Sequence, residues 1–139
     1  MSQGAGAAPP SAETVLVVED EVLIRMVISA YLRDCGYAVI EAANADEAIV
    51  VLQQFERGVD VVFSDVEMPG TMDGFGLAQW IRSNKPGVDV ILAGSVTRAV
   101  QAASELCEAN EGIPKPYEPQ TVLDRIRRLL AARSARRHD

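Results

Sequence analysis

The sequence predicts an α/β fold in which a parallel sheet carries helices on both faces. Short, mostly apolar runs rich in β-branched residues recur along the chain, as in strands buried on both sides. Segments with helical periodicity separate these runs, and the connections between them are short. This alternation is typical of a doubly wound sheet with right-handed crossovers, here with five strands and five helices.

The strand predictions differ in strength. The clearest strands are the apolar runs at residues 14–18, 59–63 and 88–93. A weaker strand is expected at 38–41, and a very short fifth strand at 111–113.

The helix predictions rest on apolar stripes and on recognisable ends. Residues 22–35 repeat apolar side chains at helical spacing, and Gly36 is placed to end that helix. Asn44 is a candidate N-cap for the second helix, with Glu47 as its capping-box partner. Further helices are expected at 74–84, at 98–109 and from Pro119 onward.

Composition and charge exclude several classes of protein. A chain of 139 residues with 48% apolar and 24% charged side chains is an ordinary single globular domain. No apolar run reaches the roughly 18 residues of a membrane span. The net charge is −7, yet residues 125–139 hold six arginines and one aspartate. The acidic remainder disfavours duplex DNA as a partner, and the basic end suits an acidic partner or a solvated helix terminus.

The rare residue types narrow the chemistry further. Two cysteines, Cys35 and Cys107, are too few for a disulfide framework and match no metal-binding spacing, which favours a reducing cytoplasm. The single histidine, His138, excludes a structural zinc site and a histidine-based catalytic triad. We expect a disordered leader over residues 1–12, one domain over 13–133 and a basic tail over 134–139.

Charged residues cluster where the expected strands end. Glu19 and Asp20 follow the first strand, Asp65 follows the third, and Lys115 follows the fifth. Ligands of doubly wound sheets bind beyond the carboxyl ends of the strands, so these groups are expected at one edge. Converging carboxylates raise one another's pKa, and a hard divalent ion such as Mg²⁺ relieves that cost. Solvated loop residues are the alternative interpretation.

With these motifs in place, the sequence resembles the receiver domain of bacterial two-component response regulators. The resemblance spans residues 14–133 and rests on VLVVED at 15–20, on DVEMPGTMDG at 65–74, and on Lys115-Pro116. It implies a flavodoxin-like (βα)5 fold with strand order 2-1-3-4-5. It also implies that Asp65 accepts a phosphoryl group from a histidine kinase or a histidine phosphotransfer protein.

The same resemblance assigns roles to the other site residues. It implies that Mg²⁺ is held by Glu19, Asp20, Asp65 and the backbone carbonyl of Glu67, and that Lys115 pairs with the phosphoryl oxygens. The chain would be a phosphoacceptor and not an enzyme in the ordinary sense. As a stand-alone cytoplasmic receiver, a monomer or weak dimer, it would signal through an unidentified output protein without binding DNA or membranes.

Two positions depart from the family pattern. Receivers carry Thr or Ser at the end of the fourth strand, where this chain has Ala93, and Ser95 is the candidate replacement hydroxyl. Receivers also carry an aromatic residue three positions before the lysine, where this chain has Gly112. A pseudo-receiver that binds partners independently of phosphate is therefore the alternative function. A phosphatase is a third and weaker hypothesis, because this activity needs a second catalytic acid near Asp65. Glu67 is the candidate for that acid.

Overall fold

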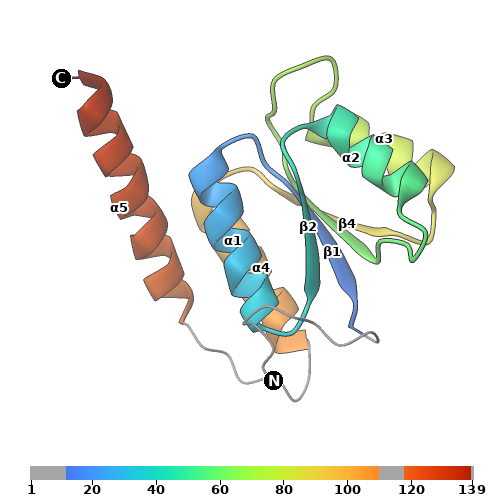
Figure 1. Cartoon of the computed structure of the whole chain (residues 1–139), viewed down its shortest axis with the longest axis horizontal. Coiled ribbons are helices and arrows are strands. Elements are labelled where there is room, and N and C mark those ends of the chain that lie inside the picture. Colours follow the sequence, from blue (N-terminus) through green and yellow to red (C-terminus); the bar gives the residue numbers. More distant parts are fainter. Residues whose placement is uncertain (1–11, 110–117, 139) are drawn as a thin grey trace.

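The computed structural model describes residues 12–109 and 118–138, and within them a parallel sheet lies between two layers of helices (Figure 1). The strands are β1 (Thr14–Val18), β2 (Ala38–Ala42), β3 (Val61–Asp65) and β4 (Asp89–Ala93), in the order β2-β1-β3-β4. All the described pairings are parallel, which confirms the predicted α/β class and strand order 2-1-3-4. The expected fifth strand at 111–113 lies outside the described residues.

The third strand begins two residues later than the sequence pattern predicts, and it includes Asp65. Asp60, just before β3, is tied to the start of β1. Its carboxylate accepts from the Thr14 N–H at 2.8 Å, and its backbone N–H donates to the Thr14 carbonyl at 2.9 Å. The shift carries β3 further toward the sheet edge where the predicted site residues gather.

Five helices complete the described chain. Their bounds are α1 (Val22–Asp34), α2 (Ala45–Gln54), α3 (Gly74–Asn84), α4 (Val96–Ala109) and α5 (Pro119–His138). The expected cap of α2 is present, because Asn44 Oδ1 accepts from the Glu47 N–H at 2.9 Å and Glu47 Oε1 accepts from the Ala43 N–H at 2.8 Å. The fourth helix starts earlier than its apolar pattern suggests, because Ser95 Oγ accepts from the Arg98 N–H at 3.2 Å.

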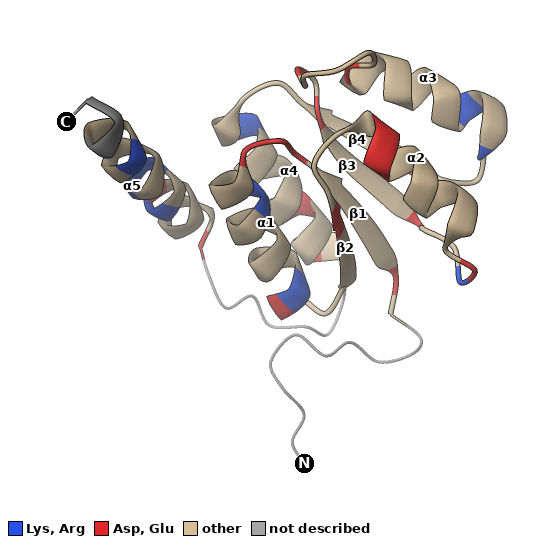
Figure 2. Cartoon of the chain, turned by 45° about the horizontal axis from the view of Figure 1, so that its top comes forward, with Lys and Arg blue, Asp and Glu red and all other residues tan. Residues whose placement is uncertain are grey.

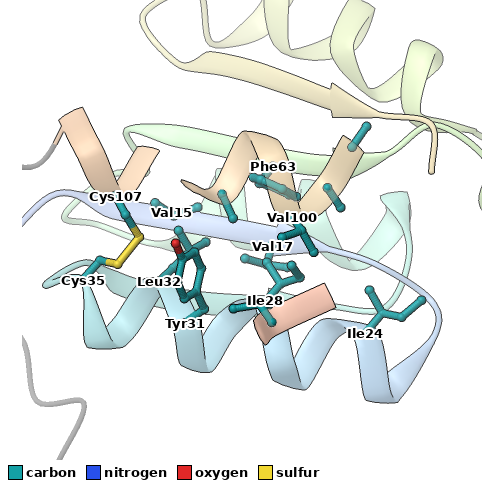
Figure 3. Close-up of a cluster of buried hydrophobic side chains, with 14 of the residues drawn as sticks. Val15, Val17, Ile24, Ile28, Tyr31, Leu32, Cys35, Phe63, Val100 and Cys107 are labelled. Atoms are coloured by element: carbon teal, nitrogen blue, oxygen red, sulfur yellow. A yellow bond between two sulfur atoms is a disulfide. The ribbon is translucent and has the colours of Figure 1, made fainter. Parts of the chain in front are cut away.

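The central strand β1 supplies both halves of the core. Its alternate side chains Val15 and Val17 join a cluster with α1, α4 and α5 (Figure 3). Leu16 and Val18 face the opposite side and join a second cluster with α2 and α3. All five residues of β1 are buried, as expected of a strand covered on both faces.

Helix α5 packs along α1 and α4 and continues through most of the segment that the sequence suggests as a basic tail. Pro119 and Gln120 border the same surface hollow as Glu108 in the last turn of α4, so α5 runs back antiparallel to α4. Near its other end, Arg133 forms an ion pair with Glu21 in the loop after β1. Figure 2 shows the basic residues of α5 and the acidic loop before α1. Part of the basic end thus pairs with the chain's own acidic edge.

The structure corrects the expectation for the cysteines, which gave no reason to predict a disulfide. Cys35 and Cys107 are bonded, with their Cα atoms 5.4 Å apart and a sequence separation of 72 (Figure 3). Spacing alone cannot reveal this contact, because it arises where the end of α1 meets the last turn of α4 on one face of the sheet. Among the described residues, no helix is both long and apolar enough to cross a membrane.

A core substitution tests the central position of β1. Leu16 is fully buried, so Leu16→Ala should lower the free energy of unfolding by about 2–5 kcal/mol through lost contacts and a residual cavity. Val50→Ala is the matched control, since Val50 is 49% exposed, and it should change stability by less than about 0.5 kcal/mol. Urea unfolding measures both, and equal losses would contradict the assignment of β1 to the core.

Candidate functional site

Three carboxylates gather at the carboxyl ends of β1 and β3. One carboxylate oxygen from each of Glu19, Asp20 and Asp65 lies within 4.8 Å of the others. The cause is the register of the two strands, in which Val18 is aligned with Ser64. Glu19 and Asp20, just after β1, therefore lie beside Asp65 at the end of β3. The structure brings together these three of the sequence-predicted site residues, whereas Lys115 lies outside the described residues.

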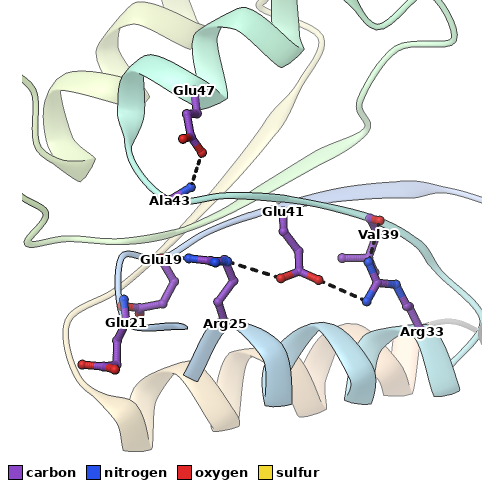
Figure 4. A network of polar contacts seen from close by, with 8 residues as sticks. All are labelled: Glu19, Glu21, Arg25, Arg33, Val39, Glu41, Ala43 and Glu47. Carbon is purple, nitrogen blue, oxygen red and sulfur yellow. Dashed lines mark hydrogen bonds and ion pairs between the residues drawn. The ribbon is translucent and has the colours of Figure 1, made fainter. Parts of the chain in front are cut away.

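The loop that carries Glu19 is held from both sides (Figure 4). The Glu19 N–H donates to the Ala42 carbonyl at 3.0 Å, which ties the loop to β2. The Glu19 carbonyl accepts from Arg25 Nη1 of α1 at 2.8 Å, and Glu19 Oε2 accepts from the Glu21 N–H at 3.0 Å. Both the backbone and the side chain of Glu19 are thus fixed.

Arg25 is itself fixed by a charged network. Glu41 on β2 pairs with Arg25 Nε at 3.3 Å through one oxygen and with Arg33 Nη1 at 3.2 Å through the other. These contacts bridge α1 to β2 beside the site (Figure 4). Sequence reasoning missed Arg25 because its partner is on another element, and no local motif joins them.

Asp65 is positioned by the end of β3 and by the start of α3. The Val66 N–H donates to the Ala93 carbonyl at 3.2 Å, and the Gly74 N–H donates to the Val66 carbonyl at 2.8 Å. A Cβ atom built on Gly74 would lie 2.3 Å from the Asp65 carbonyl oxygen, so only glycine permits this approach. Gly74 is a second residue whose role sequence reasoning missed, although it belongs to the DVEMPGTMDG motif.

Two carboxyl groups of this cluster, Glu19 and Asp65, have raised pKa values. Burial is the main cause that raises the pKa of Glu19 to about 8, and the neighbouring Asp65 and Asp20 add to it. Burial also raises the pKa of Asp65, with further contributions from Asp20 and Glu67, while backbone N–H donors oppose the shift. The Glu67 N–H is one of these donors, at 3.4 Å from Asp65 Oδ1. Among the described residues, Arg25 is the cation that opposes the shift at Glu19, and it does not offset the effects that raise that pKa.

The cluster fits a hard divalent cation. Its ligand atoms are carboxylate oxygens, and Asp20 is exposed, which leaves room for water ligands. Mg²⁺ binds in this way, through a few carboxylates and several waters. Asp65, Asp20 and Glu19 are the residues that could hold it.

A cavity of about 210 Å³ adjoins Asp65. Ala93 lies directly opposite Asp65 in the β3–β4 register, and it offers only a methyl group there. Ser95 lines the same cavity, and its hydroxyl oxygen already caps α4 by accepting from the Arg98 N–H. Besides Ala93, the apolar part of the lining comes from β1, α1, β3 and α4: Val17, Val18, Ile24, Ile28, Phe63, Val96 and Ala99.

The raised pKa of Glu19 predicts a pH effect on the stability of the metal-free protein. Between its ordinary value of 4.5 and the raised value of about 8, Glu19 ionises in the unfolded chain before it ionises in the folded one. Its contribution to the free energy of unfolding is therefore fully present below pH 4.5 and is lost as the pH rises to about 8.

Chemical unfolding at several pH values, in the native chain and in Glu19→Gln, checks this prediction. The free energy of unfolding of Glu19→Gln should exceed that of the native chain at pH 8 and not at pH 4.5. Millimolar Mg²⁺ should reduce this difference between the two proteins. A difference between the two proteins that does not change with pH would contradict the shift.

Known proteins share this sequence pattern. The family model for the response regulator receiver domain matches residues 15–127. Two relatives are each 34% identical: the transcriptional regulatory protein ResD of Bacillus subtilis over 116 residues and the sensor kinase CckA of Brucella abortus over 118 residues. Each alignment covers 84% of this chain, but only 47% of ResD and 12% of CckA. The chain thus spans about half, or less, of the length of these relatives.

Solved structures agree with the sequence match. The response regulator protein TrrA of Thermotoga maritima, crystallised in complex with Mg²⁺–BeF, is 30% identical with a TM-score of 0.53, over 84% of this chain and 98% of TrrA. A CheY-like receiver domain protein of Methanospirillum hungatei has the same fold, with a TM-score of 0.57 and 24% identity over 91% of this chain and 99% of that protein. By the match over residues 15–127 and the parallel sheet that carries it, this chain belongs to the response regulator receiver family.

Proposed function

We propose that the chain is a phosphoacceptor of a two-component phosphorelay, with Asp65 as the residue that receives the phosphoryl group. The observation that carries this proposal is the convergence of Glu19, Asp20 and Asp65 at one edge of the sheet. The donor would be a phosphohistidine on a histidine kinase or on a phosphotransfer protein. Among the relatives, the protein named as a sensor kinase, CckA, contains a segment similar to this chain.

The transfer needs little from the protein beyond positioning and charge. A carboxylate oxygen of Asp65 attacks phosphorus, the bond between phosphorus and the imidazole nitrogen breaks, and the imidazole leaves with a proton from solvent. Asp65 must be ionised to attack, so the transfer should slow on acidification. Bound Mg²⁺ would supply positive charge to the phosphoryl oxygens. Lys115 is proposed as a second cation for those oxygens.

The likeness to TrrA supports this choice, because that protein was crystallised with Mg²⁺–BeF. The same edge of the present sheet offers three carboxylates whose spacing suits a cation, and two of them, Glu19 and Asp65, have raised pKa values. We further propose that the domain, in a cytoplasmic setting and as a monomer or weak dimer, signals by contact with an output protein. The net charge of −7 supports a protein partner over direct contact with DNA.

One observation favours the second candidate function, a pseudo-receiver with weak or phosphate-independent switching. Ala93 faces Asp65 across the β3–β4 pair and cannot bond a phosphoryl oxygen. The cavity beside Ala93 is the space that a larger side chain with a hydroxyl group would fill. Ser95 could donate its hydroxyl proton while still accepting the capping bond from Arg98.

Substitution of the acceptor tests the first function. With Mg²⁺ and a small acyl phosphate donor, the native chain should gain the mass of one phosphoryl group, and Asp65→Asn should gain none. Asp46→Asn, which removes an exposed carboxylate at the start of α2, is the matched control and should behave as the native chain does. Intact mass spectrometry reads the result, and an unchanged gain in Asp65→Asn would refute the assignment.

A hydroxyl introduced at Ala93 tests the second function. A charge-assisted hydrogen bond contributes about 1.5–3 kcal/mol, so Ala93→Thr should strengthen the response of α4 to beryllofluoride and Mg²⁺ by roughly ten- to a hundredfold in population. Amide chemical shifts of α4 measure that response.

Ser95→Gly tests the substitute hydroxyl, because glycine at an N-cap costs only a few tenths of a kcal/mol. A weaker α4 response in this variant supports the Ser95 route. A full response in the native chain that neither substitution changes would show that the missing hydroxyl is unimportant.

A further inference from the structure

The disulfide joins the two helices that cover one face of the sheet. Cys35 is the C-cap residue of α1, and Cys107 lies in the last turn of α4 (Figure 3). Both residues are buried, with 0% and 1% of their surface exposed. The bond therefore ties the far end of α4 to α1 at a point inside the core.

The fully buried face of α4 consists mainly of small side chains: Ala99, Val100, Ala103, Ser104 and Cys107. Val96, Ala102 and Leu106 pack against the same core while partly buried. Small side chains remove little apolar surface from water, and hydrophobic attachment scales with that surface. The covalent bond therefore adds a restraint to a packed surface of modest size in the C-terminal half of α4.

The domain nevertheless has enough other contacts to persist without this bond. The Tyr37 hydroxyl donates to the Leu106 carbonyl at 2.6 Å, which ties the same turn of α4 to the residue before β2. Cys35 and Cys107 also belong to an apolar cluster that includes Tyr31, Leu32 and Ile126, so two thiols there would behave as small hydrophobic groups. Reduction should therefore loosen α4 and leave the sheet intact.

The other end of α4 lies at the candidate site. Ser95, which caps the helix, and Val96, its first residue, line the cavity next to Asp65. A helix of 14 residues is about 20 Å long and moves largely as one body. A restraint on its C-terminal turn therefore limits how far its N-terminal turn can shift.

We propose that Cys35 and Cys107 form a reversible thiol–disulfide switch that restrains α4 when oxidised and frees it when reduced. The co-reactant is a dithiol reductant, small or protein-borne. One of its thiolates attacks a sulfur of the pair to give a mixed disulfide, and its second thiol displaces the protein thiol. Two electrons and two protons pass to the protein, which gains two thiols while the reductant becomes a disulfide.

The setting of the pair decides how a reductant could reach it. In compartments that contain a glutathione or thioredoxin pool, disulfides are typically transient or redox-sensing. Because both sulfurs are buried, exchange requires an opening of the last turn of α4, and the reductant therefore acts where the helix is to be released. The effect of this release on signalling rests on the proposed function of Asp65.

The first experiment needs no phosphoryl group. Amide hydrogen exchange is compared in the oxidised native chain and after treatment with dithiothreitol, with alkylation and intact mass to count thiols. Reduction should expose two thiols and speed exchange in residues 103–109 by tenfold or more beyond any increase in α2 on the opposite face. The melting temperature should fall by an amount on the order of 10 °C, because the bond closes a long loop in the unfolded chain.

The double variant Cys35→Ala with Cys107→Ala controls for the reagent and for packing. It should exchange as the reduced native chain does and should not respond to dithiothreitol. Two alkylatable thiols after oxidation with a small disulfide would overturn the proposal. Equal exchange of α4 in both redox states would overturn it as well, and so would a uniform increase across all helices, which would indicate general destabilisation.

The second experiment adds Mg²⁺ and beryllofluoride to both redox forms. Amide shifts in α4 should be larger in the reduced form, while shifts around Asp65 itself should be alike in the two forms. Equal α4 shifts in both forms would refute the coupling to the site. Absence of any shift near Asp65 would instead count against the proposed function, and the first experiment would still decide whether the thiol switch exists.

Discussion

The burial of β1 on both faces is the constraint on which the other features depend. Val15 and Val17 fill one core and Leu16 fills the other, so the register of this strand is fixed by packing on two sides at once. A slip of one residue would exchange the two sets of side chains and bury the wrong ones. Because β3 pairs with β1 in a fixed register, the same packing sets the distance between Asp65 and the loop that follows β1.

Packing thus gathers carboxylates at a cost in electrostatic free energy. Burial and mutual repulsion raise the pKa values of Glu19 and Asp65, and the structure offsets part of this cost with backbone donors and with Arg25. Such a site is stabilised further by any ligand that brings positive charge. A receiver needs this property, since its acceptor must be anionic and must also tolerate an approaching phosphoryl group.

Helix α4 connects the two chemistries proposed for this chain. Its first turn borders the cavity next to Asp65, and its last turn carries the disulfide to α1. Ala93 removes one contact that could move this helix, because a methyl group cannot bond a phosphoryl oxygen. The proposed thiol–disulfide switch would control the same helix by a direct restraint in the folded state.

The sequence by itself determined the α/β class, the ends of most helices and strands, and the set of carboxylates after β1 and β3, because periodicity and strand-end position are local properties of the chain. It also placed Ala93 at the end of the fourth strand, and the structure shows that this end lies opposite Asp65. Only the tertiary structure decided the Cys35–Cys107 bond, the bridge from Arg25 to Glu41 and the close approach at Gly74. Each of these contacts joins different helices and strands, and such contacts exist only once these elements have packed together.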